Sequence, residues 1–395
     1  MSLALSPRRA ILMPGPWVRD ELWRRARAVP SLDLRFAERK DLIDVISGLQ
    51  LITYTRAGSG TFVGSGGLAE TAGTNVPRFD HHPATGECLG LLVEEQRTNL
   101  LLQSRTLTAT AWVATNVTPA KNQVGADGVG NSASSITATA ANGTILQAVT
   151  SASAARATSA YVKRITGTGV VEMTQNGGTT WTAITVTTSW SRVSIPSATV
   201  TNPSVGFRIA TSGDAIAVDY VQCENGAFVT SAIETTTAAV TRNADVVSIT
   251  GTNFSSWYRQ DEGTIFASCQ NTQNTSGVVF GVGDTFSNTI YVTAATANNV
   301  IWLSGGIYQG AITASISSLL SNVIVTYRAN DLAATSNGGT ISTDTSGAVP
   351  INPVRLKIGS SAWETTGTNI PGGHIRRITY WPQRLSNPTL QTLTR

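Results

Sequence analysis

Short segments with alternating side chains, and not helical stretches, fill most of this chain after residue 45. Those in the middle of the chain read TSAYVKRI, WTAITV, SWSRVSI and VGFRIA, and those toward its end read TIFASCQ, NTIYVTA, NVIVTYR and HIRRITYW. β-Branched and aromatic residues alternate with small polar ones, and Gly- and Asn-rich turns separate the segments. This pattern restricts the chain to an all-β protein built from packed sandwiches.

The length of the chain predicts more than one domain. With 395 residues, of which 41% are hydrophobic and 13% charged, it suits two or three ordered domains. We expect two tandem β-sandwiches, at residues 99–245 and 246–395. A small β module at residues 41–98 and a basic N-terminal arm at residues 1–40 precede them. The Thr-rich stretch at residues 235–241 is the softest boundary between the sandwiches.

The N-terminal arm carries the one clear helical pattern, at residues 16–30. It also carries the basicity, because residues 1–40 hold nine Lys or Arg against four Asp or Glu, which leaves 19 against 20 for the rest. A helix this short is marginal in isolation and needs a surface to lie on. We expect it to dock onto a neighbouring protein; the alternative is that it folds back on its own domain. The anchoring residues would be Trp17, Val18, Leu22, Trp23, Arg24 and Arg25.

The balanced charge of the remaining chain argues against several partner classes. A nucleic-acid-binding domain needs a basic stripe to neutralise phosphates, and the residues after the arm have no such excess. No window approaches the ~18 apolar residues of a membrane span, so we expect no membrane insertion. Three cysteines at wide spacing do not fit a disulfide framework or a zinc site.

Candidate catalytic and metal-binding residues are sparse. Asp80, His81 and His82 are adjacent, but neighbours in an extended segment point to opposite faces, so they indicate a turn and not a metal site. Glu94 and Glu95 fail as a glycosidase pair for the same reason. We therefore predict no catalytic residues, no cofactor and no metal. A structural calcium ion at a loop carboxylate such as Asp127 stays open beside an ordinary Asp-Gly turn.

Aromatic residues near turns are the candidates for binding sugar, because a pyranose offers an apolar face to a flat ring. Trp302 and Tyr308 flank the Gly305-Gly306 turn, and Trp363 lies in the loop SSAWETTGTN. We predict that these three form a glycan-binding platform on the C-terminal sandwich, the alternative being packing in a core or an interface. Trp112 and Trp190 are expected to be structural.

Three stretches of the chain form a recognisable pattern: YTRAGSGTFV, NVPRFDHHPATGECLGLLVEEQRTNLL and VDYVQCENGAFVTSAIETTTAAVTRNADVV. They resemble modules that recur in fibres, spikes and related appendages of tailed bacteriophages. The C-terminal RLKIGSSAW and GGHIRRITYWPQRLSNPTLQTLT resemble the closing strands of a concanavalin A-like, laminin-G-type sandwich. The resemblance implies a jelly roll like that of carbohydrate-binding modules at residues 99–245 and a concanavalin A-like sandwich after it.

The resemblance also implies a function. It predicts a non-enzymatic structural component of a tailed-phage virion, assembled in the host cytoplasm and anchored to other virion proteins by its arm. The sandwiches would project as a fibre, spike or decoration, in a homotrimer, and would bind host surface polysaccharide. Two alternatives remain open: a polysaccharide-degrading tailspike enzyme, and an internal baseplate or capsid protein that needs only interfaces.

Overall fold

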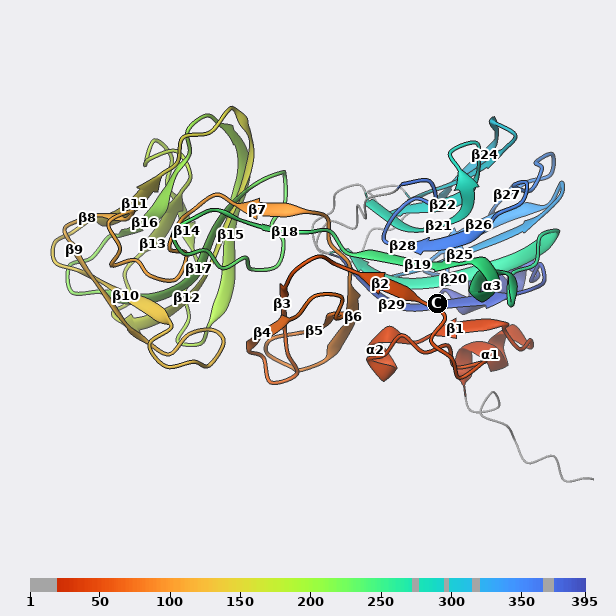
Figure 1. Cartoon of the computed structure of the whole chain (residues 1–395), viewed down its shortest axis with the longest axis horizontal. Helices are drawn as coiled ribbons and strands as arrows, with labels where there is room; N and C mark the ends of the chain where they lie inside the picture. Colours follow the sequence, from red (N-terminus) through yellow and green to blue (C-terminus); the bar gives the residue numbers. More distant parts are fainter. Residues whose placement is uncertain (1–19, 272–276, 295–297, 315–319, 365–372) are drawn as a thin grey trace, which may run out of the picture.

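The computed structural model describes residues 20–271, 277–294, 298–314, 320–364 and 373–395. Figure 1 shows two β-sandwiches side by side, a smaller one formed by the middle of the chain and a larger one that holds the C-terminus. The all-β prediction with two sandwiches is confirmed.

The smaller sandwich consists of two antiparallel sheets of five strands each. Its core contains Ile136, Val162, Phe207 and Val218, each at most 1% exposed, and the predicted structural Trp112. In sheet order, the strands of the first sheet are β15 (Ser191–Val200), β12 (Ala154–Thr166), β17 (Ala215–Asn225), β10 (Ala133–Ala138) and β9 (Val117–Gln123), and those of the second are β14 (Thr182–Ile184), β13 (Val171–Thr174), β16 (Ser204–Ile209), β11 (Gly143–Ala148) and β8 (Val113–Thr115).

The larger sandwich pairs strands from both ends of the chain. One sheet runs β27 (Ser342–Asp344), β26 (Leu332–Ser336), β25 (Leu320–Arg328), β20 (Glu262–Asn271), β29 (Gly373–Trp381), β6 (Cys88–Leu92) and β5 (Phe79–His81), and β1 (Leu32–Leu34) also pairs with β29. The other runs β2 (Thr53–Thr55), β19 (Val246–Thr250), β28 (Arg355–Ile358), β21 (Gly277–Thr285), β22 (Asn288–Ala294), β23 (Asn298–Ser304) and β24 (Ile307–Ala314). A separate hairpin joins β3 (Gly60–Val63) to β4 (Ala69–Ala72).

The smaller sandwich is inserted into the larger one, and the two are not consecutive. The chain leaves through β7 (Arg97–Asn99) and returns through β18 (Val240–Arg242), and these strands pair with each other as a two-stranded neck. Strands β2 and β6, which precede β7, belong to the larger sandwich, because β2 pairs with β19 and β6 pairs with β29, whereas the β3–β4 hairpin forms a sheet of its own. The expected independent module at residues 41–98 is therefore corrected: strands of three to five residues cannot bury a core alone and complete the sheets of the C-terminal sandwich.

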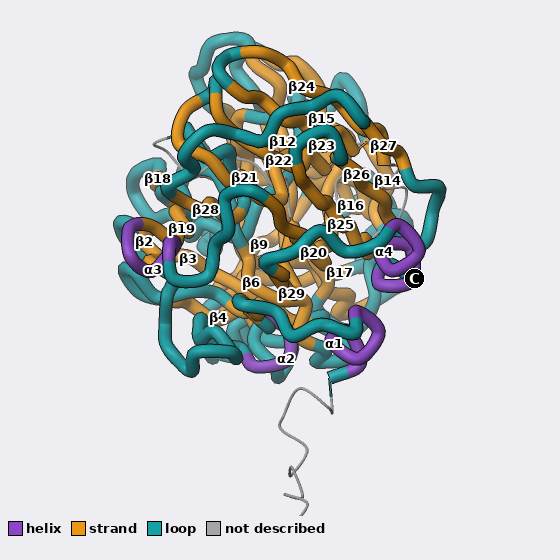
Figure 2. The backbone as a smooth tube through the Cα atoms, turned by 90° about the vertical axis from the view of Figure 1, so that its right-hand side faces the viewer, coloured by secondary structure: helices purple, strands orange, loops and turns teal. Residues whose placement is uncertain are grey.

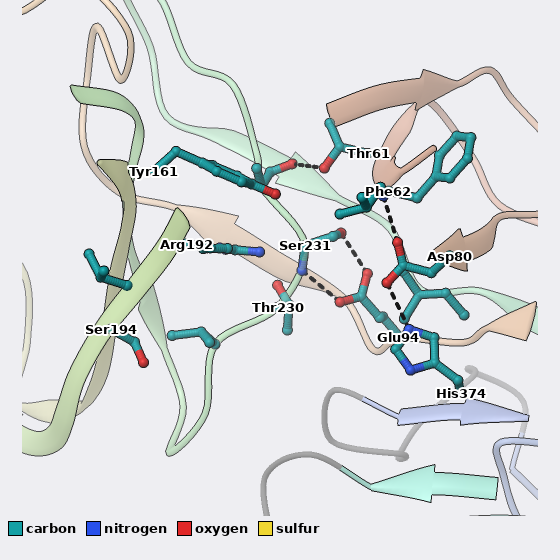
Figure 3. A pocket seen from close by; sticks show the side chains of 15 residues that line it. Thr61, Phe62, Asp80, Glu94, Tyr161, Arg192, Ser194, Thr230, Ser231 and His374 are labelled. Atoms are coloured by element: carbon teal, nitrogen blue, oxygen red, sulfur yellow. Dashed lines mark hydrogen bonds and ion pairs between the residues drawn. The ribbon is translucent and has the colours of Figure 1, made fainter. Parts of the chain in front are cut away.

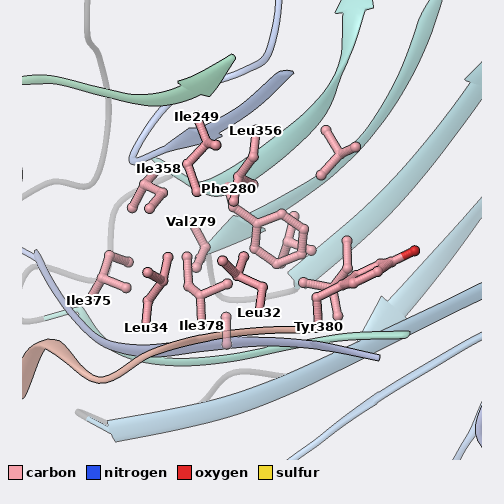
Figure 4. Close-up of a cluster of buried hydrophobic side chains, with 14 of the residues drawn as sticks. Leu32, Leu34, Ile249, Val279, Phe280, Leu356, Ile358, Ile375, Ile378 and Tyr380 are labelled. Carbon is pink, nitrogen blue, oxygen red and sulfur yellow. The ribbon is translucent and has the colours of Figure 1, made fainter. Parts of the chain in front are cut away.

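The N-terminal strand is part of the core of the larger sandwich. Leu32 and Leu34 of β1 are 0% exposed and point between the sheets toward Phe280 and Ile378 (Figure 4). The residue range 1–40 is thus not a free arm throughout. From residue 32 it is structural, because removing these side chains would leave a cavity in the core.

In the part of the chain that the structure describes, four short helices lie at the margins of the larger sandwich: α1 (Glu21–Ala26), α2 (Phe36–Arg39), α3 (Gly251–Ser255) and α4 (Asn387–Leu393). Helix α1 begins at Asp20, whose carboxylate accepts a hydrogen bond from the backbone N–H of Trp23. It packs beside α4, and both helices lie along one side of the strands (Figure 2). The cluster between them includes Trp23, Trp381 and Leu390.

The anchoring residues predicted for the arm divide into three groups. Trp17 and Val18 lie outside the described residues. Trp23 is 5% exposed, donates its Nε1–H to Asp33 over 3.0 Å and packs under the guanidinium of Arg35, while Leu22 is partly buried in the same cluster. Arg24 and Arg25 are exposed. Helix α1 folds back on its own domain, which was the alternative to docking on a neighbouring protein. Trp23 is therefore corrected from a docking residue to a core residue.

Candidate functional site

A cavity of about 390 Å³ opens between the two sandwiches, beside the neck. Tyr161 of β12 and Arg192 of β15 line it from the smaller sandwich (Figure 3). Asp80 of β5 lines it from the larger one, Phe62 of the β3–β4 hairpin is also part of the lining, and Ser231 lies on the connection that leads back to the neck. The volume is within the ~300–1,000 Å³ range of small-molecule sites.

Strand pairing places the two residues on the wall of the smaller sandwich side by side. Tyr161 and Arg192 are directly opposite each other in the β12–β15 ladder, so their side chains emerge on the same face. The guanidinium carbon of Arg192 lies 5.8 Å from the centre of the Tyr161 ring, and its Nη2 donates to the Ser159 hydroxyl over 3.0 Å. Burial raises the pKa of Tyr161, so its phenol is neutral and can donate a hydrogen bond.

The wall from the larger sandwich centres on Asp80. Its Oδ1 accepts a hydrogen bond from the backbone N–H of Val63 over 2.5 Å, and its Oδ2 lies 2.7 Å from Nε2 of His374. His374 is 5% exposed, and its Nδ1 has no hydrogen-bond partner among the described residues. The wall therefore holds a carboxylate in place through a backbone amide and an imidazole.

Glu94 closes the base of the cavity as a carboxylate held by protein hydrogen-bond donors. Its carboxylate accepts hydrogen bonds from Arg78 Nη1 over 2.7 Å and from the backbone N–H and hydroxyl of Ser231 over 2.7 and 2.6 Å. Burial by itself would raise the pKa of Glu94, but the positive charges of Arg242 and Arg78 outweigh it and hold this pKa well below its usual range. A carboxylate in this state cannot serve as a general acid near neutral pH.

Beneath Glu94 the ion pairs continue through Asp245, which is 0% exposed. Asp245 accepts hydrogen bonds from Tyr54 Oη over 2.5 Å, Arg56 Nη1 over 3.0 Å, Arg78 Nη2 over 2.5 Å and the backbone N–H of Glu94 over 2.8 Å. We call the set Tyr54, Arg56, Arg78, Glu94, Arg242 and Asp245 the junction network. It lies where the neck meets the larger sandwich.

Sequence reasoning did not identify the junction network as a unit. Glu94 was considered only as half of a failed glycosidase pair, and its partners are up to 151 residues away along the chain. A signal was nevertheless present, because every member lies in one of four short stretches that the sequence analysis quotes: YTRAG, NVPRFD, VEEQRTN and VTRNADVV. These stretches come together at one place in the fold, the junction between the sandwiches.

The predicted aromatic platform is not assembled as expected. Trp302 is 0% exposed, because it lies on the inward face of β23 opposite the buried Ile290, and it is corrected from a surface residue to a core residue. Tyr308 is 55% exposed at the start of β24. Trp363 is partly buried and packs edge-on against Phe286 and Tyr291, with ring centroids 5.1 and 5.2 Å apart.

The loop carboxylate considered for calcium is held by protein groups. Asp127 accepts hydrogen bonds from Arg105 Nη2 over 2.7 Å, the Ser132 hydroxyl over 2.9 Å and the backbone N–H of Val129 over 3.0 Å. Within the described ranges, no three His, Cys, Asp or Glu residues are grouped to hold a metal ion. None of the helices in those ranges is long and apolar enough to cross a membrane, and Cys88, Cys223 and Cys269 are buried free thiols.

Comparison with known proteins adds a distant likeness to part of the fold. No family model and no curated protein matches the chain. Among solved structures, the CBM40 module of the Ruminococcus gnavus IT-sialidase is 17% identical with a TM-score of 0.31, over 34% of this chain and 83% of that one. The NanB sialidase of Streptococcus pneumoniae is 14% identical with a TM-score of 0.32, over 37% of this chain and only 26% of its own length. Likenesses at this level carry no argument about function.

Proposed function

We propose that this chain is a non-enzymatic structural component of a tailed-phage virion that holds two sandwiches in a fixed relation and presents them to host surface glycans. The observation that supports it most is the junction network. The stretches that resemble phage appendage modules are the ones that build this network, so the resemblance and the most specialised contact in the fold coincide.

A fixed junction suits a projecting protein. The neck crosses between the sandwiches twice, and its two strands pair in register from Arg97 to Asn99. Below it, Arg56 and Arg78 are 1% and 0% exposed and are each bonded to Asp245. Charge-assisted bonds between buried, planar guanidinium groups and carboxylates have strict geometry, which fixes the base of the neck, through Arg242 and Asp245, on the larger sandwich.

The charges of the cavity favour binding over hydrolysis. A glycosidase needs one carboxyl group that is protonated when the substrate arrives and a second that is ionised. Glu94 is locked in its ionised form by Arg242 and Arg78, and Asp80 is bonded to His374 and Val63. These two carboxylates support a role in holding the cavity together, and a polysaccharide-degrading enzyme is the less favoured alternative.

The N-terminus is proposed as the attachment point to the virion. Residues 20–34 are integrated into the larger sandwich, so the docking segment reduces to residues 1–19, which contain Trp17 and Val18, together with exposed Arg24 and Arg25 of α1. We further propose that the partners are other virion proteins, that the protein is a homotrimer, and that assembly takes place in the host cytoplasm.

Labelled protein tested against a panel of bacterial strains examines this proposal. The comparison is between the full chain and a variant lacking residues 1–19; a deletion to residue 40 would remove the buried Leu32 and Leu34 and unfold the larger sandwich. Saturable binding to particular strains by both proteins supports host recognition, whereas no binding to any strain leaves the internal architectural role. Release of reducing ends from the surface polysaccharide of a bound strain would refute the non-enzymatic assignment. Light scattering, which measures the molar mass in solution, tests the trimer.

A further inference from the structure

We propose that the cavity between the sandwiches binds a carboxylate-bearing sugar, with Arg192 as the residue that holds the anion. This deepens the proposed function and rests on it, since a virion protein meets such sugars in the polysaccharides of a bacterial surface. It assigns the host-binding site to a place other than the predicted aromatic platform. Figure 3 shows Arg192 and Tyr161 pointing from the smaller sandwich toward the connection at Thr230 and Ser231.

Arg192 is a partly buried cation that no carboxylate contacts directly in the described part of the chain. Among the described residues it forms no ion pair; its one hydrogen bond goes to the neutral hydroxyl of Ser159, and its Nε is buried without a partner. The arginines at the base of the cavity differ, since Arg78 and Arg242 lie 2.7 and 3.5 Å from Glu94. Desolvating a charge without pairing it is unfavourable, and a guanidinium is best satisfied by the two oxygens of a carboxylate. A bound carboxylate would supply the missing partner.

The carboxylates near Arg192 do not fill this role. Glu224 interacts electrostatically with Arg192, but it is buried and accepts its hydrogen bonds from the backbone N–H and hydroxyl of Thr230, both over 2.7 Å. Glu94 is paired with the arginines beneath it. Asp80 is bonded to His374 on the opposite wall (Figure 3). Each is committed to other protein donors, which leaves Arg192 available to a ligand.

The rest of the lining is suited to a sugar ring and not to a bare anion. Tyr161 presents an aromatic ring next to Arg192, and its hydroxyl makes no hydrogen bond to the part of the chain that the structure describes. Phe62 is an apolar residue of the lining, and Ser194, two positions after Arg192 in β15, is exposed on the same face of the strand. An aromatic face, apolar walls and a few converging polar groups are the usual components of a site for an amphipathic ring.

Asp80 sets the orientation of the ligand. Each of its two oxygens already accepts one hydrogen bond, but a carboxylate has about four acceptor positions, so two remain for ligand hydroxyl groups. Its negative charge repels a second carboxylate. The acidic group of the sugar would therefore lie at Arg192 and its hydroxyl groups toward Asp80, with the ring across Tyr161.

Calorimetric titration of the full chain tests this site with three probes: an oligogalacturonate for hexuronic acids, N-acetylneuraminic acid for nonulosonic acids, and maltotriose as the neutral control. At least one acidic sugar should bind and maltotriose should not. Arg192→Gln keeps a donor for Ser159 but removes the charge, and it should weaken binding about tenfold or more. The matched control is Arg208→Gln, since Arg208 is a partly buried arginine of the same sandwich that is paired with Glu172 outside the cavity; its affinity should be unchanged.

The possible results separate the site from the proposed function. Equal affinity for acidic and neutral sugars, equal loss in the Arg192 and Arg208 variants, or binding to bacteria without affinity for either acidic probe would each overturn this site while leaving the virion role in place. Absence of binding to bacteria as well would count against host recognition itself. If Arg192→Gln does not fold, two other measurements test the site: the affinity of Tyr161→Phe for the acidic sugar, and the affinity of the parent protein at rising salt concentration. Affinity should fall in each of these measurements, and unchanged affinity in either one would refute the assignment.

Discussion

Replacing Asp245 with asparagine should destabilise the protein far more than a change of one atom suggests. Asp245 is fully buried and accepts bonds from two guanidinium groups, one phenol and one backbone amide. Asparagine preserves the volume but removes the charge, so Arg56 and Arg78 remain buried without their shared counter-ion. Breaking a buried ion pair by removing one partner costs about 3–5 kcal/mol. With an m-value of about 3 kcal/mol per molar urea, the unfolding midpoint should fall by about 1–2 M.

Urea unfolding followed by tryptophan fluorescence measures this change. The control is Asp261→Asn, which removes the same charge from an exposed bidentate pair with Arg259, where both bonds are 2.6 Å long. Exposed pairs contribute little because water solvates both partners, so the midpoint of this variant should stay at that of the parent. If Asp245→Asn and Asp261→Asn had the same midpoint, the network would not support the junction and the reasoning from buried charge would be wrong.

Three further predictions concern Glu94 and buried or partly buried tryptophans. The pKa of Glu94 is depressed in the folded protein, so its charged form stabilises the fold above the unfolded pKa, near ~4.3. This stability is lost as the pH falls toward and through the lower folded pKa. Glu94→Gln should therefore lose less unfolding free energy than the parent between pH 5 and pH 3, as measured by urea titration at each pH. Trp302→Ala should cost about 3–5 kcal/mol as a core cavity, whereas Trp363→Ala, at a partly accessible ring, should cost about 1 kcal/mol, both measured by thermal and urea unfolding. Trp23→Ala should lower the melting temperature, because the Trp23 ring is part of the buried cluster with Trp381 and Leu390. Binding of the folded variant to other virion proteins should not fall by more than this loss of stability explains.

The type of fold was predictable from the chain because it depends on local pattern. Alternation within segments such as VGFRIA gives strands, and inward residues of those strands, including Phe207 and Val205, form the core. The helical period near residue 20 likewise predicted a helix, which the structure places at Glu21–Ala26. Local pattern, however, does not say which strand pairs with which.

The domain boundaries and the site depended on pairing between distant strands, and there the predictions were incomplete. Leu32 pairs with Tyr380 across 348 positions, so an N-terminal segment that looks independent completes the C-terminal sandwich. Trp302 shows the same limit. Its closeness to a Gly-Gly turn suggests exposure, but side chains alternate along β23, and the alternation places Trp302 on the inward face and Leu303 on the other face. The sequence gives no sign of the role proposed for Arg192, because that role depends on the lack of a contacting carboxylate among the described residues, which only the fold reveals.

The insertion of one sandwich into the other connects the junction network to the proposed ligand site. A tandem arrangement would cross between the bodies once and leave a hinge, whereas here two paired strands cross together and the network fixes them from below. The cavity is lined from both bodies, with Arg192 on one and Asp80 on the other, so its shape depends on their relative orientation. A ligand that contacts both walls favours that orientation, and the coupling is reciprocal. Asp245→Asn should therefore weaken binding of the acidic sugar under conditions where the variant is still folded, although Asp245 does not line the cavity; unchanged affinity would mean that the walls are held independently of the neck.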